Sequence, residues 1–159
     1  MLTHRFPRKL SHYFTLARLI HSDTAREQGI DNTPPPEVIE NLRLLAAGLD
    51  EVRRLLGHPL QISSGYRCPA LNESVGGTAR SQHCLGLAAD FICPKFGPPM
   101  VVARAIAEST VHFDQCILEF GRWVHLSFSP APRRRVLTIY SGAAGYLDGL
   151  VDEAGRQLA

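Results

Sequence analysis

The chain's clearest chemical pattern joins two histidines and a carboxylate. His83 and Asp90 lie seven residues apart in Ser-Gln-His-Cys-Leu-Gly-Leu-Ala-Ala-Asp, and the residues beside Asp90 are apolar. A carboxylate buried there needs a cation or hydrogen-bond donors. Zn²⁺ is one such partner, because a catalytic zinc takes three N or O ligands and leaves a fourth position to water. His125, on the apolar segment Trp-Val-His-Leu-Ser, is the third candidate ligand.

The same spacing permits a second interpretation. Two histidines and one aspartate this far apart also occur by chance, and a buried aspartate is often hydrogen-bonded to a neighbouring loop. A hydrogen-bonded scaffold without metal is therefore the alternative, and elemental analysis of untagged protein distinguishes the two.

Three helical segments precede or separate the strands that must carry these residues. Apolar residues recur every three or four positions between Pro36 and Gly57, which predicts a long amphipathic helix. Residues 10–28 predict a shorter helical region, and Pro98-Pro99 begins a helix that extends to Glu108.

Five strands are predicted from β-rich runs bounded by turn residues, at 59–64, 87–93, 114–120, 123–129 and 136–141. The polar, Gly-rich segment 63–90 is predicted to be a site-building loop, and the stretch from Gly142 has only weak patterning. Helices in the first half and strands in the second predict an α+β single domain, 1–159, whose largely antiparallel sheet is covered on one face by helices.

Composition narrows the class of protein. The chain has 159 residues, is 45% apolar and 20% charged, and carries a net charge of +2, which argues against nucleic-acid binding. No segment has the length for membrane insertion, and residues 1–14 contain no signal-peptide stretch, so we expect a monomer made in the cytoplasm. The four cysteines, Cys68, Cys84, Cys93 and Cys116, form no CxxC pair, and their disulfide state is left open.

Several short motifs together carry a family resemblance. They are S-G-Y-R (64–67), Asn72, V-G-G (75–77), S-x-H-x-x-G-x-A-x-D (81–90) and W-V-H-x-S (123–127). In this combination the chain resembles the zinc D-Ala-D-Ala carboxypeptidase family of peptidoglycan peptidases over roughly residues 10–130. The resemblance implies the hedgehog/DD-peptidase-like fold, with one Zn²⁺ held by His83, Asp90 and His125.

The resemblance also implies roles for neighbouring residues. Arg67 would stabilise the oxyanion of the attacked carbonyl or anchor a substrate carboxylate; its alternative is a loop ion pair. Ser81 matches a position that lines the substrate site, although a turn-forming serine is equally expected there. Trp123 and the loop 68–80 are candidate walls of the substrate cleft.

The general base departs from the family pattern. Many members place a glutamate three residues before the last histidine, where this chain has Arg122, and another branch places a histidine five residues before it, where this chain has Phe120. Glu119, six residues before His125, is the nearest carboxylate and the candidate catalytic base.

Whether Glu119 reaches the site depends on the turn that follows it. A three-residue loop at 121–123 would place Glu119 opposite His125 on one face of the sheet. A two-residue loop would instead pair Leu118 with His125 and turn Glu119 away. We favour the first arrangement, with a solvated strand-end glutamate as the alternative.

Two functions from different classes follow. The first is a zinc metallopeptidase that cuts peptidoglycan stem peptides or cross-links, as a carboxypeptidase or an endopeptidase. Without a signal peptide it would act at the cell wall after phage-type release, as a lysin or tail component. The second is a metal-bound but catalytically silent module that binds cell wall or protein.

Overall fold

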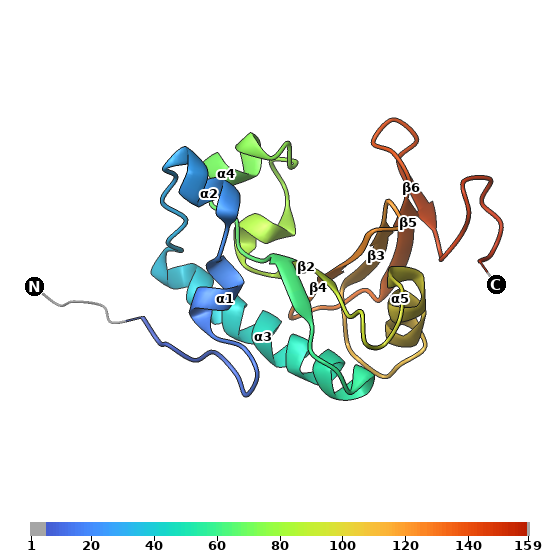
Figure 1. Ribbon diagram of the computed structural model, residues 1–159, viewed down its shortest axis with the longest axis horizontal. Coiled ribbons are helices and arrows are strands. Elements are labelled where there is room, and N and C mark those ends of the chain that lie inside the picture. The colour runs from blue at the N-terminus through green and yellow to red at the C-terminus, as the bar shows by residue number, and fades with distance from the viewer. Residues whose placement is uncertain (1–5, 159) are drawn as a thin grey trace, which may run out of the picture.

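The computed structural model describes residues 6–158, which form six helices and one six-stranded sheet (Figure 1). In chain order the elements are α1 (Leu16–Ile20), α2 (Asp23–Gln28), α3 (Pro36–Leu56), β1 (Gln61–Ser64), α4 (Pro69–Ser74), the 3₁₀ helix η1 (Gln82–Leu85), β2 (Ala88–Ile92), α5 (Pro99–Ala107), β3 (Gln115–Glu119), β4 (Trp123–Ser127), β5 (Arg135–Ile139) and β6 (Tyr146–Asp148). Within this part of the chain, no helix has both the length and the apolar character needed to span a membrane.

The strands lie in the order β1-β2-β4-β3-β5-β6. All neighbouring pairs are antiparallel except β3 and β5, which are parallel. The predicted α+β class and mostly antiparallel sheet are thus confirmed. The parallel pair arises because the chain after β4 returns to the start of β3, where the Arg134 and Arg135 N–H groups donate to the carbonyls of Phe113 and Asp114.

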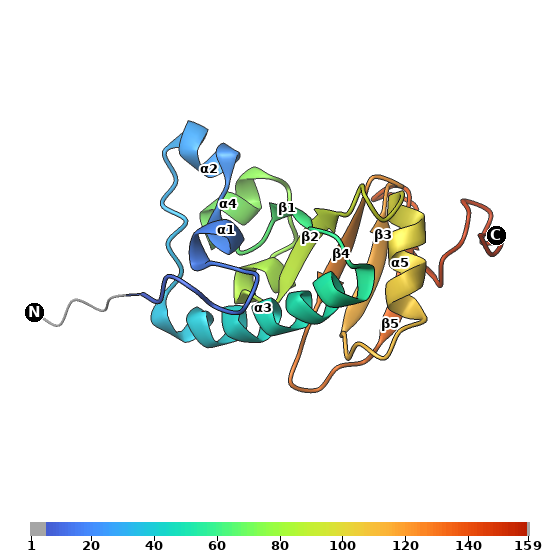
Figure 2. The same cartoon turned by 60° about the horizontal axis from the view of Figure 1, so that its bottom comes forward.

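One face of the sheet packs against α3 and α5, which Figure 2 shows beside the strands. Apolar side chains from both helices and from alternate strand positions form the main core, among them Leu42, Leu45, Leu49, Val102, Ile106, Phe91, Val124 and Leu126. Because successive strand residues point to opposite faces, Asp90 and His125 point away from this core. The opposite face of the sheet therefore carries the chemistry.

The predicted helix over residues 10–28 is wrong in extent. Residues before Thr15 form a loop because the buried carboxylate of Asp50, on α3, accepts hydrogen bonds from Ser11 Oγ and from the backbone N–H groups of His12 and Tyr13 at 2.8–3.1 Å. The remainder divides into α1 and α2, each with a side-chain N-cap.

Other differences lie where local patterns are short. The predicted loop 63–90 contains α4 and η1, and β6 forms in the weakly patterned C-terminal stretch. All four cysteines, which lie within residues 6–158, are free. Cys93 and Cys116 are buried, and burial raises the pKa of the Cys116 thiol to about 12.

Candidate metal centre

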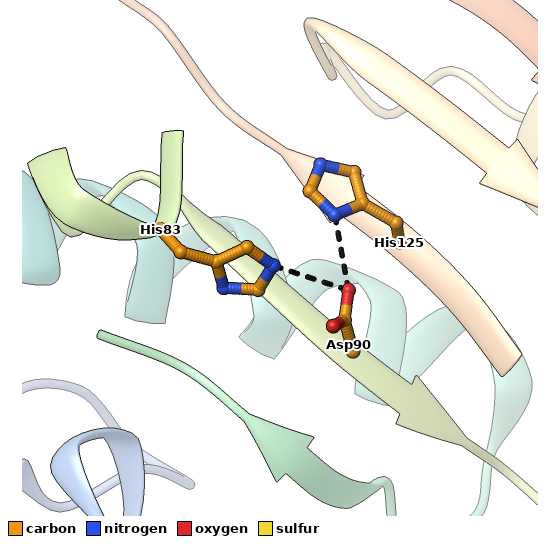
Figure 3. A group of neighbouring side chains, drawn as sticks. All are labelled: His83, Asp90 and His125. Atoms are coloured by element: carbon orange, nitrogen blue, oxygen red, sulfur yellow. Dashed lines mark hydrogen bonds and ion pairs between the residues drawn. The ribbon is translucent and has the colours of Figure 1, made fainter. Parts of the chain in front are cut away.

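Two adjacent strands and η1 bring three potential metal ligands together. Asp90 on β2 is directly paired with His125 on β4, so both side chains lie on the same face of the sheet. His83 reaches them from η1, which directly precedes β2 in the chain (Figure 3). All three residues are buried.

Backbone contacts fix the orientation of His83. Ser81 caps η1, its Oγ accepting from the His83 N–H at 3.2 Å, and the ring Nδ1 lies 2.7 Å from the carbonyl oxygen of Gly65. Gly65 is required there because a Cβ atom would lie 2.2 Å from the carbonyl oxygen of Leu19. The glycine of the S-G-Y-R motif thus lets the chain pass α1 closely enough to hold the histidine.

The three ligand atoms converge on one point. Asp90 Oδ1 lies 3.2 Å from His83 Nε2 and 3.0 Å from His125 Nδ1, and all three atoms lie within 4.8 Å of one another (Figure 3). Since a carbonyl can only accept, the Gly65 contact requires a proton on His83 Nδ1. Burial lowers the pKa of His83 and so favours the neutral ring, whose Nε2 lone pair then faces a carboxylate oxygen. Two acceptors facing each other in a buried site fit a cation between them.

The charge of Asp90 supports the same conclusion. Burial raises the pKa of this carboxyl, but its contacts with the imidazoles of His125 and His83 outweigh burial and hold the pKa well below its usual range. The Arg67 guanidinium lies 3.8 Å from the second carboxylate oxygen. Asp90 is therefore anionic, as a metal ligand must be.

Glu119 lies beside this group, in a register that differs from both predictions. Glu119 is opposite Trp123, and Ile117 is opposite His125, because the hairpin loop is 120–122. Glu119 still lies on the same face of the sheet as His125. Its partner Trp123 is two residues from His125 on β4, and every second side chain of a strand lies on the same face. Its Oε1 lies 3.7 Å from His125 Nδ1, and Trp123 Nε1 donates to its Oε2 at 2.9 Å.

The environment of Glu119 suits proton transfer. Burial raises the pKa of its carboxyl above the ordinary value, and the nearby His125 only partly offsets this. A carboxyl with a raised pKa, one side chain away from a metal group, is the usual arrangement of a general base.

Comparison with models of protein families identifies the family of the chain. The model of the Peptidase M15 family matches residues 12–127 of the chain, which include all three metal ligands, Arg67 and Glu119. The chain belongs to the M15 peptidase family. No protein with curated function matches the chain. The predicted family, fold and metallopeptidase class are thereby confirmed.

Arg67 of this M15 peptidase is held by the motif residues around it. Its Nη1 donates to Asn72 Oδ1 at 3.0 Å, and Asn72 in turn donates to the carbonyl of Thr78 at 2.8 Å. A Cβ atom at Gly77 would lie 2.0 Å from Asn72 Oδ1 and 2.9 Å from Arg67 Nη1, which explains the second glycine of V-G-G. The buried Nε of Arg67 has no hydrogen-bond partner among the described residues.

The M15 metal group opens into a cleft of about 710 Å³. The predicted candidates Arg67, Ser81, Glu119 and Trp123 all line it, as do Leu71 and Val75–Thr78 of the predicted wall loop. The cleft is also lined by residues that the sequence did not indicate, among them His21, Arg133 and Tyr146. No motif in the sequence marks His21 or Arg133 as site residues, and Tyr146 lies in a stretch without a strong periodic signal.

A buried ion-pair network links the M15 metal group to the loop before β5. Asp114, only 2% exposed, accepts from Gln82 Nε2 at 2.9 Å and from the Arg133 N–H, Nε and Nη2 at 3.0, 2.9 and 2.8 Å. Gln82 directly precedes the ligand His83 on η1. Asp114 therefore fastens the element that carries His83.

Replacing Asp114 by Asn is expected to lower the free energy of unfolding at pH 7 by about 1–2 kcal/mol. The expected loss is kept this small because Arg133 is half exposed, so that water screens its charge. Hydrogen bonds from Arg133 outweigh burial and lower the pKa of Asp114 to about 2. Because the pKa of Asp114 is lower in the folded protein, its ionised carboxyl stabilises the fold at pH values above the unfolded-state pKa of about 3.9. This contribution is lost as the pH falls towards about 2. Urea unfolding of both proteins should therefore show a difference at pH 7 that shrinks below pH 4. A difference independent of pH would contradict the assignment.

Proposed function

We propose that this M15 peptidase is a zinc enzyme that hydrolyses amide bonds in the stem peptides or cross-links of peptidoglycan. The observation that carries the proposal is the joint placement of Glu119, Arg67 and the His-Asp-His group in one open cleft. Peptide hydrolysis at a metal site needs a general base for the attacking water, here Glu119, and a positive charge for the oxyanion, here Arg67.

The ligand set favours zinc. Two imidazole nitrogens and one carboxylate oxygen match a catalytic zinc site with one open position, and the cleft provides that opening. Such an ion supplies Lewis acidity, which polarises a peptide carbonyl and makes water a better nucleophile.

Glu119 is positioned to move the protons of the reaction. Its carboxylate takes a proton from the attacking water, and the raised pKa lets the resulting acid pass that proton to the departing amine nitrogen. The Trp123 hydrogen bond to Oε2 holds the carboxylate while Oε1 remains on the side of His125.

Arg67 is positioned to stabilise negative charge. Arg67 lines the cleft, and its guanidinium, held between Asn72 and Asp90, carries further N–H donors on Nη1 and Nη2. In the cleft those donors can bind the developing oxyanion or the terminal carboxylate of a peptide ending in D-Ala.

The silent binding module is disfavoured by the position of Glu119. A non-catalytic site has no need for a carboxyl group within reach of the metal group, whereas Glu119 lies 3.7 Å from one of its ligands. Action at the cell wall follows from the proposed substrate, and phage-type release stays a prediction.

Mass spectrometry of defined muropeptides after incubation with zinc-loaded protein tests the proposal. Loss of a terminal D-Ala would identify a carboxypeptidase, and separation of cross-linked dimers would identify an endopeptidase. Intact muropeptides after incubation with fully metallated protein would overturn the proposal.

A further inference from the structure

Tyr146 lies on the catalytic face of the sheet although it is distant in sequence from the matched family region, residues 12–127. In the ladder, Trp123 pairs with Glu119, Glu119 with Ile139, and Ile139 with Tyr146. Residues paired directly across strands share a face. Trp123 and Tyr146 therefore stand on opposite sides of Glu119 in one row that crosses four strands.

The part of the sheet between Tyr146 and the metal group is apolar. Ile117, Leu137 and Ile139 are buried on this face and form a cluster separate from the main core. Of these three, Ile117 is paired with the candidate ligand His125 and lines the cleft. A substrate side chain beside the metal group would therefore meet an apolar surface at Ile117.

Tyr146 is available to such a peptide. Its side chain lines the cleft and is 57% exposed, although it belongs to a strand. Strands lie about 4.8 Å apart, so two strand spacings place its backbone about 10 Å from that of Glu119. Tyr146 and Glu119 both line the cleft, so a peptide bound at Glu119 lies within reach of the Tyr146 ring.

The hydroxyl of Tyr146 is a hydrogen-bond donor in this setting. Burial raises its pKa, and the carboxylates of Glu119 and Asp90 raise it further. The phenol stays protonated around neutral pH, and a neutral phenol can donate to a peptide carbonyl.

We propose that Tyr146 is a substrate-binding residue that sets specificity next to the scissile bond. Its ring packs on a small aliphatic side chain of the substrate, and its hydroxyl donates to a backbone carbonyl of the substrate. This assignment rests on the proposed peptidase function, and it extends the substrate site beyond the matched family region.

Steady-state kinetics and binding of muropeptides to Tyr146→Ala and Tyr146→Phe test the assignment. We expect KM to rise about tenfold in Tyr146→Ala and about threefold in Tyr146→Phe, with kcat within about twofold of wild type. Replacing the alanine next to the scissile bond by glycine should weaken cleavage by wild type but change little in Tyr146→Ala. Tyr13→Ala, an exposed tyrosine outside the cleft, is the control.

Binding without turnover separates this assignment from the proposed function. The chain has one tryptophan, Trp123, whose fluorescence reports cleft occupancy. If wild type binds muropeptides without cutting them and Tyr146→Ala binds about tenfold more weakly, the peptidase proposal fails and only the binding role of Tyr146 stands. If Tyr146→Ala matches Tyr13→Ala in KM and binding, the assignment is wrong while the peptidase proposal is untouched. Absence of both binding and cleavage in wild type overturns both.

Discussion

Replacing Glu119 by Gln is expected to lower kcat by about 10²–10⁴-fold while the protein keeps its metal. The amide has nearly the same shape as the carboxyl group and can still accept from Trp123 Nε1, but it cannot take a proton from water. The loss should therefore fall on kcat rather than on KM, because substrate contacts remain.

Muropeptide turnover and zinc content, measured on the same preparation, check this expectation. Glu37→Gln, at an exposed position on α3 outside the cleft, is the matched control and should keep wild-type kcat. A Glu119→Gln variant with wild-type kcat would show that another group moves the proton.

Replacing His83 by Ala is expected to weaken zinc binding by more than about 100-fold and to abolish hydrolysis. Residues that only hydrogen-bond to a metal ligand already change metal affinity by about 10–100-fold, so loss of the ligand His83 itself should weaken binding further. The variant removes one of the three candidate ligands and leaves Asp90, which is 7% exposed, without its contact to His83 Nε2.

Elemental analysis and competition with a zinc chelator measure this loss without reference to activity. Zinc should raise the thermal unfolding temperature of wild type and leave that of His83→Ala unchanged. His112→Ala, an exposed histidine outside the metal group, should bind zinc like wild type. Retention of zinc by His83→Ala would show that His83 is not a ligand, and absence of zinc from wild type would favour the metal-free scaffold.

The hairpin after β3 shows where prediction from sequence failed on a detail that matters. Phe120 and Gly121 both have positive φ, 56° and 65°, and Arg122 N–H closes the turn on the carbonyl of Glu119. A bulky aromatic residue seldom adopts this conformation, so the Phe-Gly pair carries no recognisable turn signal. The Phe120 N–H donates to the carbonyl of Ile139 on β5, a contact across the sheet that stabilises the turn.

The sequence by itself determined the chemistry of the metal group. The ligand motif 81–90 is local: it contains the capped turn of η1, its left-handed end at Gly86 and the strand that buries Asp90. Its spacing left a metal-free scaffold open, and its combination with the other motifs of the family resemblance favoured the metal. His125 adds the third ligand through a strand whose alternation is visible in the sequence.

Only the tertiary structure decided the surroundings of that group. The register of Glu119, the Asp114–Arg133–Gln82 network and the approach of Tyr146 all depend on contacts between segments distant in sequence. The parallel pairing of β3 with β5 carries Tyr146 to the cleft, and no local pattern encodes which strand a returning chain will join. Such pairings are set by burial over the whole sheet, because a strand's hydrogen bonds and apolar face can be satisfied by more than one neighbour.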